Sequence, residues 1–196
     1  MPDEVNFAER YARAETPWDS GKPSEELLQV LNAGKLTGKT VLEIGCGTGT
    51  NAIELAQRGF AVTAVDYVEQ PIQAAREKAR QAKVKVDFRV ADVVKDDLGG
   101  PYDILFDRGV YHHLRTEDLK RFQEFLKRVT RRGSWWLSLA GNAKEKIENG
   151  PPVVHEREIR AELGPLFDIL ELREFRFSTG QSDFRPLAWS ILMRRK

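Results

Sequence analysis

The 196-residue chain has one cysteine, three histidines and no long apolar run. The single cysteine, Cys46, cannot form a disulfide within the chain, so we expect a protein of the reducing cytoplasm. A membrane span needs about 18 consecutive apolar residues, and no stretch of the sequence approaches that length, so no membrane segment is expected. The polar, acidic N-terminus is also unlike a secretory signal.

An excess of charge of either sign is missing as well. Lys and Arg number 31 against 30 Asp and Glu, which gives a net charge of +1. Proteins that bind nucleic acids or membrane surfaces commonly carry a basic excess, so the balance favours neither partner. The length is typical of one domain with a sizeable core, and we expect a single domain over residues 1–196.

Glycine, by contrast, is concentrated at one place. An apolar run over residues 41–44 predicts a buried strand, residues 52–58 predict a helix, and Gly45, Gly47 and Gly49 lie between them. A strand–loop–helix junction exposes backbone N–H groups to a ligand. Glycine also lets a ligand approach the main chain closely. The stretch therefore predicts a ligand-binding loop.

An acidic residue follows the next apolar run. Residues 60–65 predict a second strand, which ends at Asp66, and an acid about 20 residues after such a loop accepts hydrogen bonds from ribose hydroxyls. The glycine spacing, G-x-G-x-G, differs from the G-x-G-x-x-G of dinucleotide sites. Glu43 precedes the first glycine by two residues, which suits a cationic ligand better than a pyrophosphate. A nucleoside site is predicted, with an NAD(P)-linked oxidoreductase as an alternative.

The stretch VLEIGCGTGTN, residues 41–51, together with Asp66 resembles motif I of the class I S-adenosylmethionine (SAM)-dependent methyltransferases. In that family the loop lies against the amino-acid and ribose parts of SAM, and the acid after strand two binds the ribose. The resemblance implies SAM as the cofactor. The cofactor-binding residues that it implies here are Glu43, Gly45, Cys46, Gly47, Asp66 and Tyr67.

The third predicted strand, residues 84–90, is followed by Asp92 and Val93. In the resembled family an acid at this place binds the adenine amine, and the backbone N–H of the next residue meets the ring. Both residues are therefore implied at the cofactor. The alternative for Asp92 is a cap on a local turn.

The fourth predicted strand, residues 102–106, leads into Asp107-Arg108-Gly109 and then His112-His113, and residues 116–128 predict the helix that follows. This resembles the D-R-[G/C]-x-x-H-H-L stretch of small-molecule methyltransferases. The resemblance places Asp107, Arg108 and Gly109 at the cofactor. The carboxyl edge of an open α/β sheet is where ligands collect.

The histidine pair has three possible roles. Metal binding is disfavoured, because neighbouring residues point in different directions and no further ligand with suitable spacing accompanies them, so no metal is expected. Either ring could be buried and structural. Otherwise His112 or His113 could accept a proton from the methyl acceptor as a general base, a role for which Tyr11 and Asp19 are further candidates.

The N-terminal pattern Pro17-Trp18-Asp19-x-Gly21-x-Pro23 resembles the segment that closes over SAM in small-molecule methyltransferases. These include the thiol, halide, thiopurine and tellurite-type enzymes and phenol O-methylating proteins. Residues 1–37 are therefore expected to form a lid in which Trp18 contacts the cofactor, since an aromatic face attracts a cation such as a sulfonium. The alternative is that Trp18 is a hydrophobic plug at the edge of the domain.

The expected fold is α/β: a Rossmann-like, doubly wound, seven-stranded sheet. Residues 133–139 predict the fifth strand, and residues 167–177 and 187–193 predict two strands with no helix between them. An antiparallel C-terminal hairpin on a mostly parallel sheet follows. The polar residues 140–152 are expected to form a long loop at the wall of the substrate site.

The predicted activity is SAM-dependent methyl transfer to a sulfur or oxygen of a small molecule. Thiols, halides, phenols and metalloid oxyanions are the acceptor classes that the resemblance implies. The sequence has no N-P-P-Y-type element after strand four and no charge excess, which disfavours nucleic-acid or protein N-methylation. The other alternative is a SAM-binding protein without catalytic activity. The sequence makes no prediction of the oligomeric state.

Overall fold

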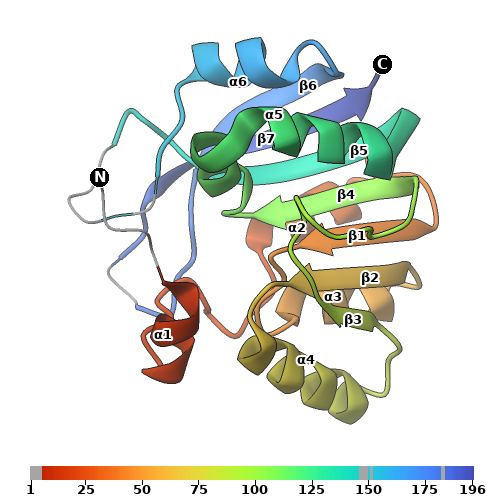
Figure 1. Ribbon diagram of the computed structural model, residues 1–196, viewed down its shortest axis with the longest axis vertical. Coiled ribbons are helices and arrows are strands. Elements are labelled where there is room, and N and C mark those ends of the chain that lie inside the picture. The colour runs from red at the N-terminus through yellow and green to blue at the C-terminus, as the bar shows by residue number, and fades with distance from the viewer. Residues whose placement is uncertain (1–5, 146–149, 151, 182–183) are drawn as a thin grey trace.

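A computed structural model describes residues 6–145, 150, 152–181 and 184–196. Seven strands form one sheet in the order β3-β2-β1-β4-β5-β7-β6 (Figure 1). The strands are β1 (Thr40–Ile44), β2 (Ala61–Asp66), β3 (Asp87–Val90), β4 (Tyr102–Arg108), β5 (Thr130–Gly141), β6 (Phe167–Arg176) and β7 (Leu187–Arg195). The first five strands are parallel, and β7 runs antiparallel to both β5 and β6. The predicted fold is thereby confirmed.

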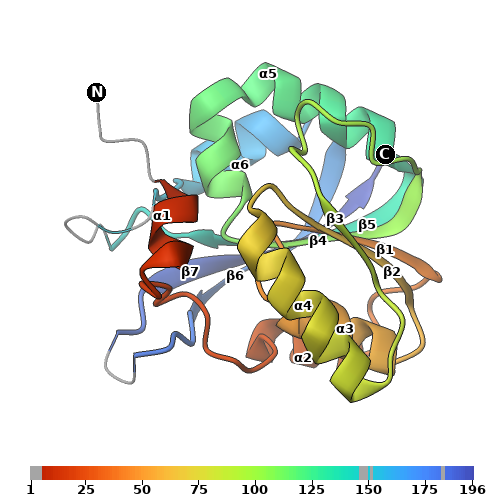
Figure 2. The same ribbon diagram turned by 60° about the horizontal axis from the view of Figure 1, so that its bottom comes forward.

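Helices cover both faces of the sheet (Figure 2). They are α1 (Phe7–Ala12), α2 (Glu25–Asn32), α3 (Thr50–Gln57), α4 (Glu69–Ala82), α5 (Tyr111–Val129) and α6 (Glu156–Leu163). Apolar residues of α2, α3 and α4 pack with one face of the strands, and those of α5 and α6 pack with the other. Two cores result because alternate residues of a buried strand point to opposite faces, as Ile104 and Leu105 of β4 do.

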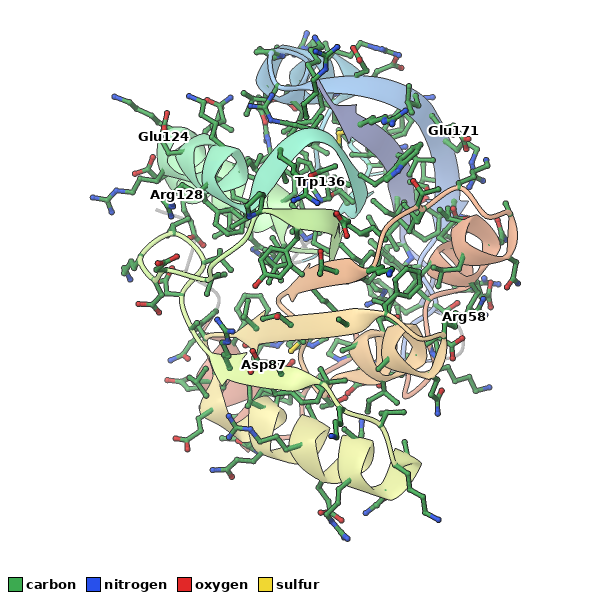
Figure 3. All side chains as sticks on the ribbon, turned by 90° about the vertical axis from the view of Figure 1, so that its right-hand side faces the viewer. Arg58, Asp87, Glu124, Arg128, Trp136 and Glu171 are labelled. Carbon is green, nitrogen blue, oxygen red and sulfur yellow. The ribbon has the colours of Figure 1, made fainter. Side chains whose placement is uncertain are left out.

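Large apolar side chains fill these cores and charged ones surround them. Figure 3 shows Trp136 of β5 inside the molecule, where its indole is fully buried. The labelled charged residues on the outside are Arg58, Asp87, Glu124, Arg128 and Glu171. Within the described part of the chain, no helix has the length and apolar character needed to cross a membrane.

The strand register brings the predicted site residues to one edge. Ile44 of β1 lies beside Val65 of β2 and beside Asp107 of β4, and Asp66 pairs with Val90 of β3. The four strands therefore end at nearly the same level, and the loops that follow them lie together. This is the edge at which open α/β sheets bind ligands.

Two predicted boundaries were wrong. Helix α5 begins at Tyr111, so His112 and His113 lie in its first turn and not in a loop before the helix. The helix is interrupted at Asp118, whose backbone is not helical and whose side chain accepts a hydrogen bond from the N–H of Arg121.

The loop expected over residues 140–152 is also shorter. Strand β5 continues to Gly141, and Asn142 forms a parallel bridge with Val154. Residues 146–149 and 151 of the predicted loop lie outside the described residues.

Candidate cofactor and acceptor site

The glycine loop, residues 45–49, connects β1 to α3, and its glycines lie where a side chain would not fit. Gly45 and Gly47 have positive φ angles of 62° and 52°, which glycine adopts without strain. A Cβ on Gly45 would lie 2.3 Å from Cγ2 of Val110, and one on Gly47 would lie 2.8 Å from the Tyr11 hydroxyl. Gly45 is nevertheless exposed, although the strand before it is buried. The loop therefore offers open main chain at the strand edge.

Asp66 ties this loop to the end of β2. Its carboxylate accepts hydrogen bonds from the N–H of Gly47 and from the N–H of Val68, each at 3.0 Å. Burial raises the pKa of Asp66 above its ordinary value. Each carboxylate oxygen has two lone pairs, so Asp66 keeps acceptor capacity for hydroxyl groups such as those of a ribose.

Glu43 lies beneath the loop with one oxygen unpaired. The residue is only 2% exposed. Its Oε1 accepts a hydrogen bond of 3.4 Å from Asn51, whereas Oε2 has no partner among the residues that the structure describes. Burial raises the pKa of Glu43 to about 8. Buried polar atoms are normally satisfied, so this oxygen fits a ligand that brings a cationic N–H group.

The predicted cofactor residues after β2 and β3 differ in their exposure and in their partners. Tyr67 is 56% exposed beside Asp66. Asp92 accepts a hydrogen bond from the N–H of Val94 at 3.0 Å and forms an ion pair with Lys95 at 2.7 Å, while Val93 is buried. The turn-capping role of Asp92 is thus present, and a ligand amine would have to share the carboxylate with Lys95.

The side chain of Asp107 is bonded within the fold, which leaves the main chain of this residue for the cofactor contact that the sequence predicts. The residue is fully buried. One carboxylate oxygen accepts the N–H groups of Val110 and Tyr111, each at 3.1 Å, and the other accepts the indole N–H of Trp136 at 3.0 Å. A side chain committed in this way stabilises the start of α5 and holds it against β5.

Arg108 connects three parts of the molecule. Its guanidinium donates hydrogen bonds to the carbonyl of Trp18 at 2.9 Å and to that of Ser178 at 2.6 Å, and it lies 4.7 Å from the ring centre of Phe177. Burial lowers the pKa of Arg108 to about 10, so the group stays charged at neutral pH. Arg108 therefore fastens the N-terminal segment and the β6–β7 connection to the end of β4. Gly109, next to it, donates its N–H to Leu139 of β5.

The N-terminal segment, residues 6–23, lies directly on the glycine loop. Asp19 accepts a hydrogen bond of 2.7 Å from the hydroxyl of Thr48, which itself accepts one of 2.7 Å from Lys78. The Trp18 indole donates to the Tyr11 hydroxyl at 3.3 Å. Asp19 thus links the segment to the glycine loop. Burial raises the pKa of Tyr11, so its hydroxyl is not suited to accept a proton at neutral pH.

The two adjacent histidines differ in availability. His112 is 3% exposed, and its Nδ1 accepts a hydrogen bond of 2.7 Å from the N–H of Gly141. Burial and the neighbouring His113 and Arg108 lower the pKa of His112, so its ring is neutral. The nitrogen that carries the lone pair, Nδ1, is already bonded to the N–H of Gly141. His113 is half-buried, and burial lowers its pKa to about 4. Of the pair, His113 therefore has the more accessible ring.

Phe7 is the site residue that sequence reasoning missed. Its ring centre lies 5.4 Å from that of Trp18, 5.2 Å from that of His113 and 6.3 Å from that of Tyr67. The available signal was its spacing of four residues from Tyr11, which places both rings on one face of a helix. That spacing alone does not say what the face covers.

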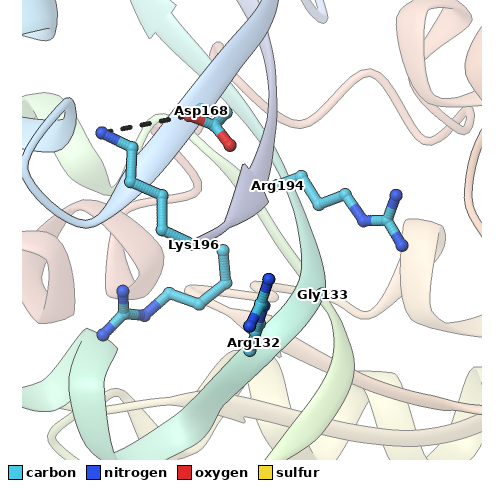
Figure 4. A pocket seen from close by; sticks show the side chains of 6 residues that line it. Arg132, Gly133, Asp168, Arg194 and Lys196 are labelled. Atoms are coloured by element: carbon cyan, nitrogen blue, oxygen red, sulfur yellow. Dashed lines mark ion pairs between the residues drawn. The ribbon is translucent and has the colours of Figure 1, made fainter.

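A separate hollow lies at the opposite edge of the sheet, where β5 begins and β7 ends (Figure 4). It has a volume of about 870 Å³ and is lined by Arg132, Gly133, Asp168, Arg194, Arg195 and Lys196. Lys196 pairs with Asp168 at 3.9 Å, and Arg195 donates to the carbonyl of Leu166. Since none of the residues described above lines it, this hollow is distinct from the candidate site.

Comparison with known sequences identifies the family. A family model described as "Methyltransferase domain" matches residues 41–133. The 2-heptyl-1-hydroxyquinolin-4(1H)-one methyltransferase of Mycobacteroides abscessus is 30% identical over 151 residues, which are 75% of this chain and 66% of that protein. The ubiquinone biosynthesis O-methyltransferase of Pseudomonas paraeruginosa is 39% identical over 72 residues, 36% of this chain and 31% of that protein. The matches thus span just under two thirds and about a third of these relatives.

Solved structures share the fold over almost the whole chain. A structure solved for work on the conversion of a disulfide bond into a thioacetal group during echinomycin biosynthesis has a TM-score of 0.83 at 23% identity, and the match covers 97% of this chain and 94% of that one. Magnesium protoporphyrin IX methyltransferase (ChlM) from Synechocystis PCC 6803 with bound SAM has a TM-score of 0.67 at 24% identity, with 100% and 87% covered. The matched methyltransferase domain, the named methyltransferase relatives and the shared fold together support a class I SAM-dependent methyltransferase.

Proposed function

We propose that this chain transfers the methyl group of SAM to an oxygen or sulfur nucleophile of a small molecule. The observation that carries the proposal is the juxtaposition of an open glycine loop, the Asp66 carboxylate and the unpaired Glu43 oxygen at one strand edge. When bound, SAM supplies a methyl carbon that an acceptor lone pair attacks as the carbon–sulfur bond breaks and its electron pair stays on sulfur, leaving S-adenosylhomocysteine (SAH).

The chain has a suitable group for each part of the cofactor. Asp66 has acceptor capacity for the ribose hydroxyls, and the Glu43 oxygen matches the ammonium of the amino-acid part. The main chain at Gly45 and Gly47 gives both parts close approach. The turn at Asp92 and Val93 lies beside them for the adenine. A pyrophosphate has no N–H group to donate to the unpaired Glu43 oxygen, which argues against an NAD(P)-linked oxidoreductase.

The remaining tasks of the protein are to orient the acceptor and to exclude water. In the N-terminal segment, the Tyr11 hydroxyl lies beside Gly47, and Trp18 donates to that hydroxyl and packs against Phe7. His113 is a weak base because its pKa is about 4, and an efficient general base has a pKa near the working pH. The site is therefore suited to acceptors that ionise readily, such as acidic hydroxyls and thiols, and not to aliphatic alcohols.

The relatives support oxygen as the nucleophile. The names of the matched proteins specify a hydroxyquinolone as the substrate of one and O-methylation in ubiquinone biosynthesis for the other. Both substrates fit the weakly basic surroundings of His113. An oxygen acceptor is accordingly the first to test for this chain.

The test is SAM-dependent formation of SAH with a panel of acidic phenols and thiols, preceded by calorimetric titration with SAM and SAH. We expect saturable binding of both and turnover with at least one acceptor. Binding without turnover on any acceptor would identify a silent SAM-binding protein. Binding of NAD(P)H in place of SAM would overturn the cofactor assignment.

A further inference from the structure

Helix α1 is held at the mouth of the site by aromatic rings. None of its six residues is buried, so the helix contributes nothing to either core. Figure 2 shows it set apart from the sheet, at the edge where the strands end. Its Phe7 contacts rings that belong to three different parts of the chain, namely Trp18, Tyr67 after β2 and His113 in α5.

These rings form a continuous wall, which reaches the glycine loop through the Tyr11 hydroxyl. Phe7 meets Trp18, His113 and Tyr67 edge to face, at interplanar angles of 67°, 79° and 89°. The wall, defined as Phe7, Trp18, Tyr67 and His113, runs from the end of β2 to the start of α5. Edge-to-face packing is a favoured arrangement of aromatic pairs. Phe7, Trp18 and His113 are each half-buried, and Tyr67 is exposed.

The polar groups near this wall have other partners. Arg108 uses its guanidinium on two backbone carbonyls, and Asp19 is bonded to Thr48. Arg10 lies 4.5 Å from the centre of the Trp18 ring. His113 is neutral at physiological pH. A metalloid oxyanion is strongly hydrated and needs several donors to replace its water, whereas the wall consists mainly of ring surface.

We infer that the methyl acceptor is a flat aromatic or heteroaromatic compound bearing an acidic hydroxyl or thiol, and that Phe7 and His113 hold its ring while Trp18 closes the side of the site. The inference rests on the proposed methyl transfer and narrows its substrate class. Aromatic acceptors combine the two properties that the wall requires: a planar apolar surface, and a nucleophile that ionises without a strong base.

The experiment measures kcat/KM for two sets of acceptors with SAM. The aromatic set is 4-nitrophenol, 4-nitrothiophenol and 7-hydroxycoumarin, and the other set is 2-mercaptoethanol, iodide and tellurite. Binding of each aromatic compound to the protein–SAH complex is measured in parallel by ligand-observed NMR. We expect the aromatic set to bind and to be methylated, with kcat/KM at least about 10-fold above that of the other set.

The variant Phe7→Leu keeps an apolar side chain but removes the ring. We expect its KM for the aromatic acceptors to rise about 5- to 10-fold, with the Kd for SAM unchanged, and we expect Phe7→Tyr to restore the KM. Phe60→Leu is the matched control, since Phe60 precedes β2 at the opposite edge of the sheet and is also half-buried. It should leave KM unaffected. A purely structural role of Phe7 would lower Tm without changing the preference between the two sets.

Three results would overturn the inference about the acceptor without refuting the proposed methyl transfer. The first is turnover confined to iodide, tellurite or 2-mercaptoethanol. The second is an unchanged aromatic KM in Phe7→Leu. The third is SAM binding with no aromatic compound either methylated or bound. Failure to bind SAM at all would instead refute the proposed function, and the titration reports that independently.

Discussion

The glycine loop and the N-terminal segment face each other across the candidate site, and they are held by different kinds of contact. The loop is fixed by main-chain geometry, by contacts that admit no Cβ, and by the buried carboxylate of Asp66. The segment is fixed by ring contacts and by a few links, such as Arg108 to the Trp18 carbonyl and Thr48 to Asp19. We call the glycine loop with Glu43 and Asp66 the cofactor wall, and residues 6–23 the acceptor wall. The cofactor wall is thus part of the fold, whereas the acceptor wall is docked onto it. Changes in the first should impair SAM binding, and changes in the second should alter acceptor use.

The largest effect on the cofactor wall is expected from Asp66→Ala. Removing a charged hydrogen-bonding group should cost about 1.5–3 kcal/mol of binding free energy, a loss of SAM affinity of about 10- to 150-fold, measured by calorimetry. Asp87→Ala is the control, because Asp87 is an exposed acid of β3 that pairs with Arg89. Equal SAM affinity in wild type and Asp66→Ala would remove the ribose assignment.

Glu43→Gln tests the cofactor wall through the pH dependence of the stability of the fold. The pKa of Glu43 rises from 4.5 to about 8 on folding, so between these values the folded state retains a proton that the unfolded state has released. Stability should therefore fall as pH rises from 4.5 to 8. The variant should lose this slope and melt on the order of 5 °C higher at pH 8. It should also bind SAM more weakly, because glutamine cannot release a proton to become the charged partner of the ammonium.

Thermal melting of both proteins between pH 5 and pH 9, with and without SAM, measures both effects. Parallel melting curves across this range would contradict the buried, proton-bearing state of Glu43. Undiminished SAM affinity in Glu43→Gln would separate that residue from the ammonium.

Arg108→Lys tests how the acceptor wall is attached. Lysine keeps the charge but lacks the planar fork that reaches two carbonyls, so one of the bonds to Trp18 and Ser178 is lost. We expect about 10-fold lower turnover and a loss of about 1–2 kcal/mol in stability, with a smaller change in SAM affinity than in Asp66→Ala. Arg194→Lys, far from the site, is the control. A larger loss of SAM binding than of turnover would mean that Arg108 belongs to the cofactor wall.

Thr48→Val should give the smallest effect, because it breaks a single link between the two walls. The hydroxyl of Thr48 joins Asp19 to the glycine loop, and one such hydrogen bond contributes about 1 kcal/mol. Turnover should fall about 3- to 6-fold with little change in Tm. Thr48→Ser, which retains the hydroxyl, should behave as wild type, and a valine variant with full turnover would show that the link is dispensable.

The sequence predicted the sheet and the cofactor wall because both are encoded locally. Short apolar runs, closely spaced glycines and Asp66 lie within a few residues of the features that they build. The roles of Asp107 and His112 were not predictable in this way. Asp107 at the end of β4 supports α5, and His112 accepts the N–H of Gly141 from β5, so each depends on a partner from another element.

Phe7 shows the same limit more strongly. Helix α1 has six residues and no buried side chain, so its position is set by rings far away in the sequence and not by a hydrophobic face of its own. Local patterns fix strands and loops, but a segment docked by tertiary contacts carries little local signal.

The most direct test of the account is calorimetric titration of SAM into the wild-type protein, with NADH titrated under the same conditions. The account predicts saturable, micromolar binding of SAM at one site and no binding of NADH. Binding of NADH without SAM, or of neither, would contradict the assignment of the glycine loop, Glu43 and Asp66 to a SAM site.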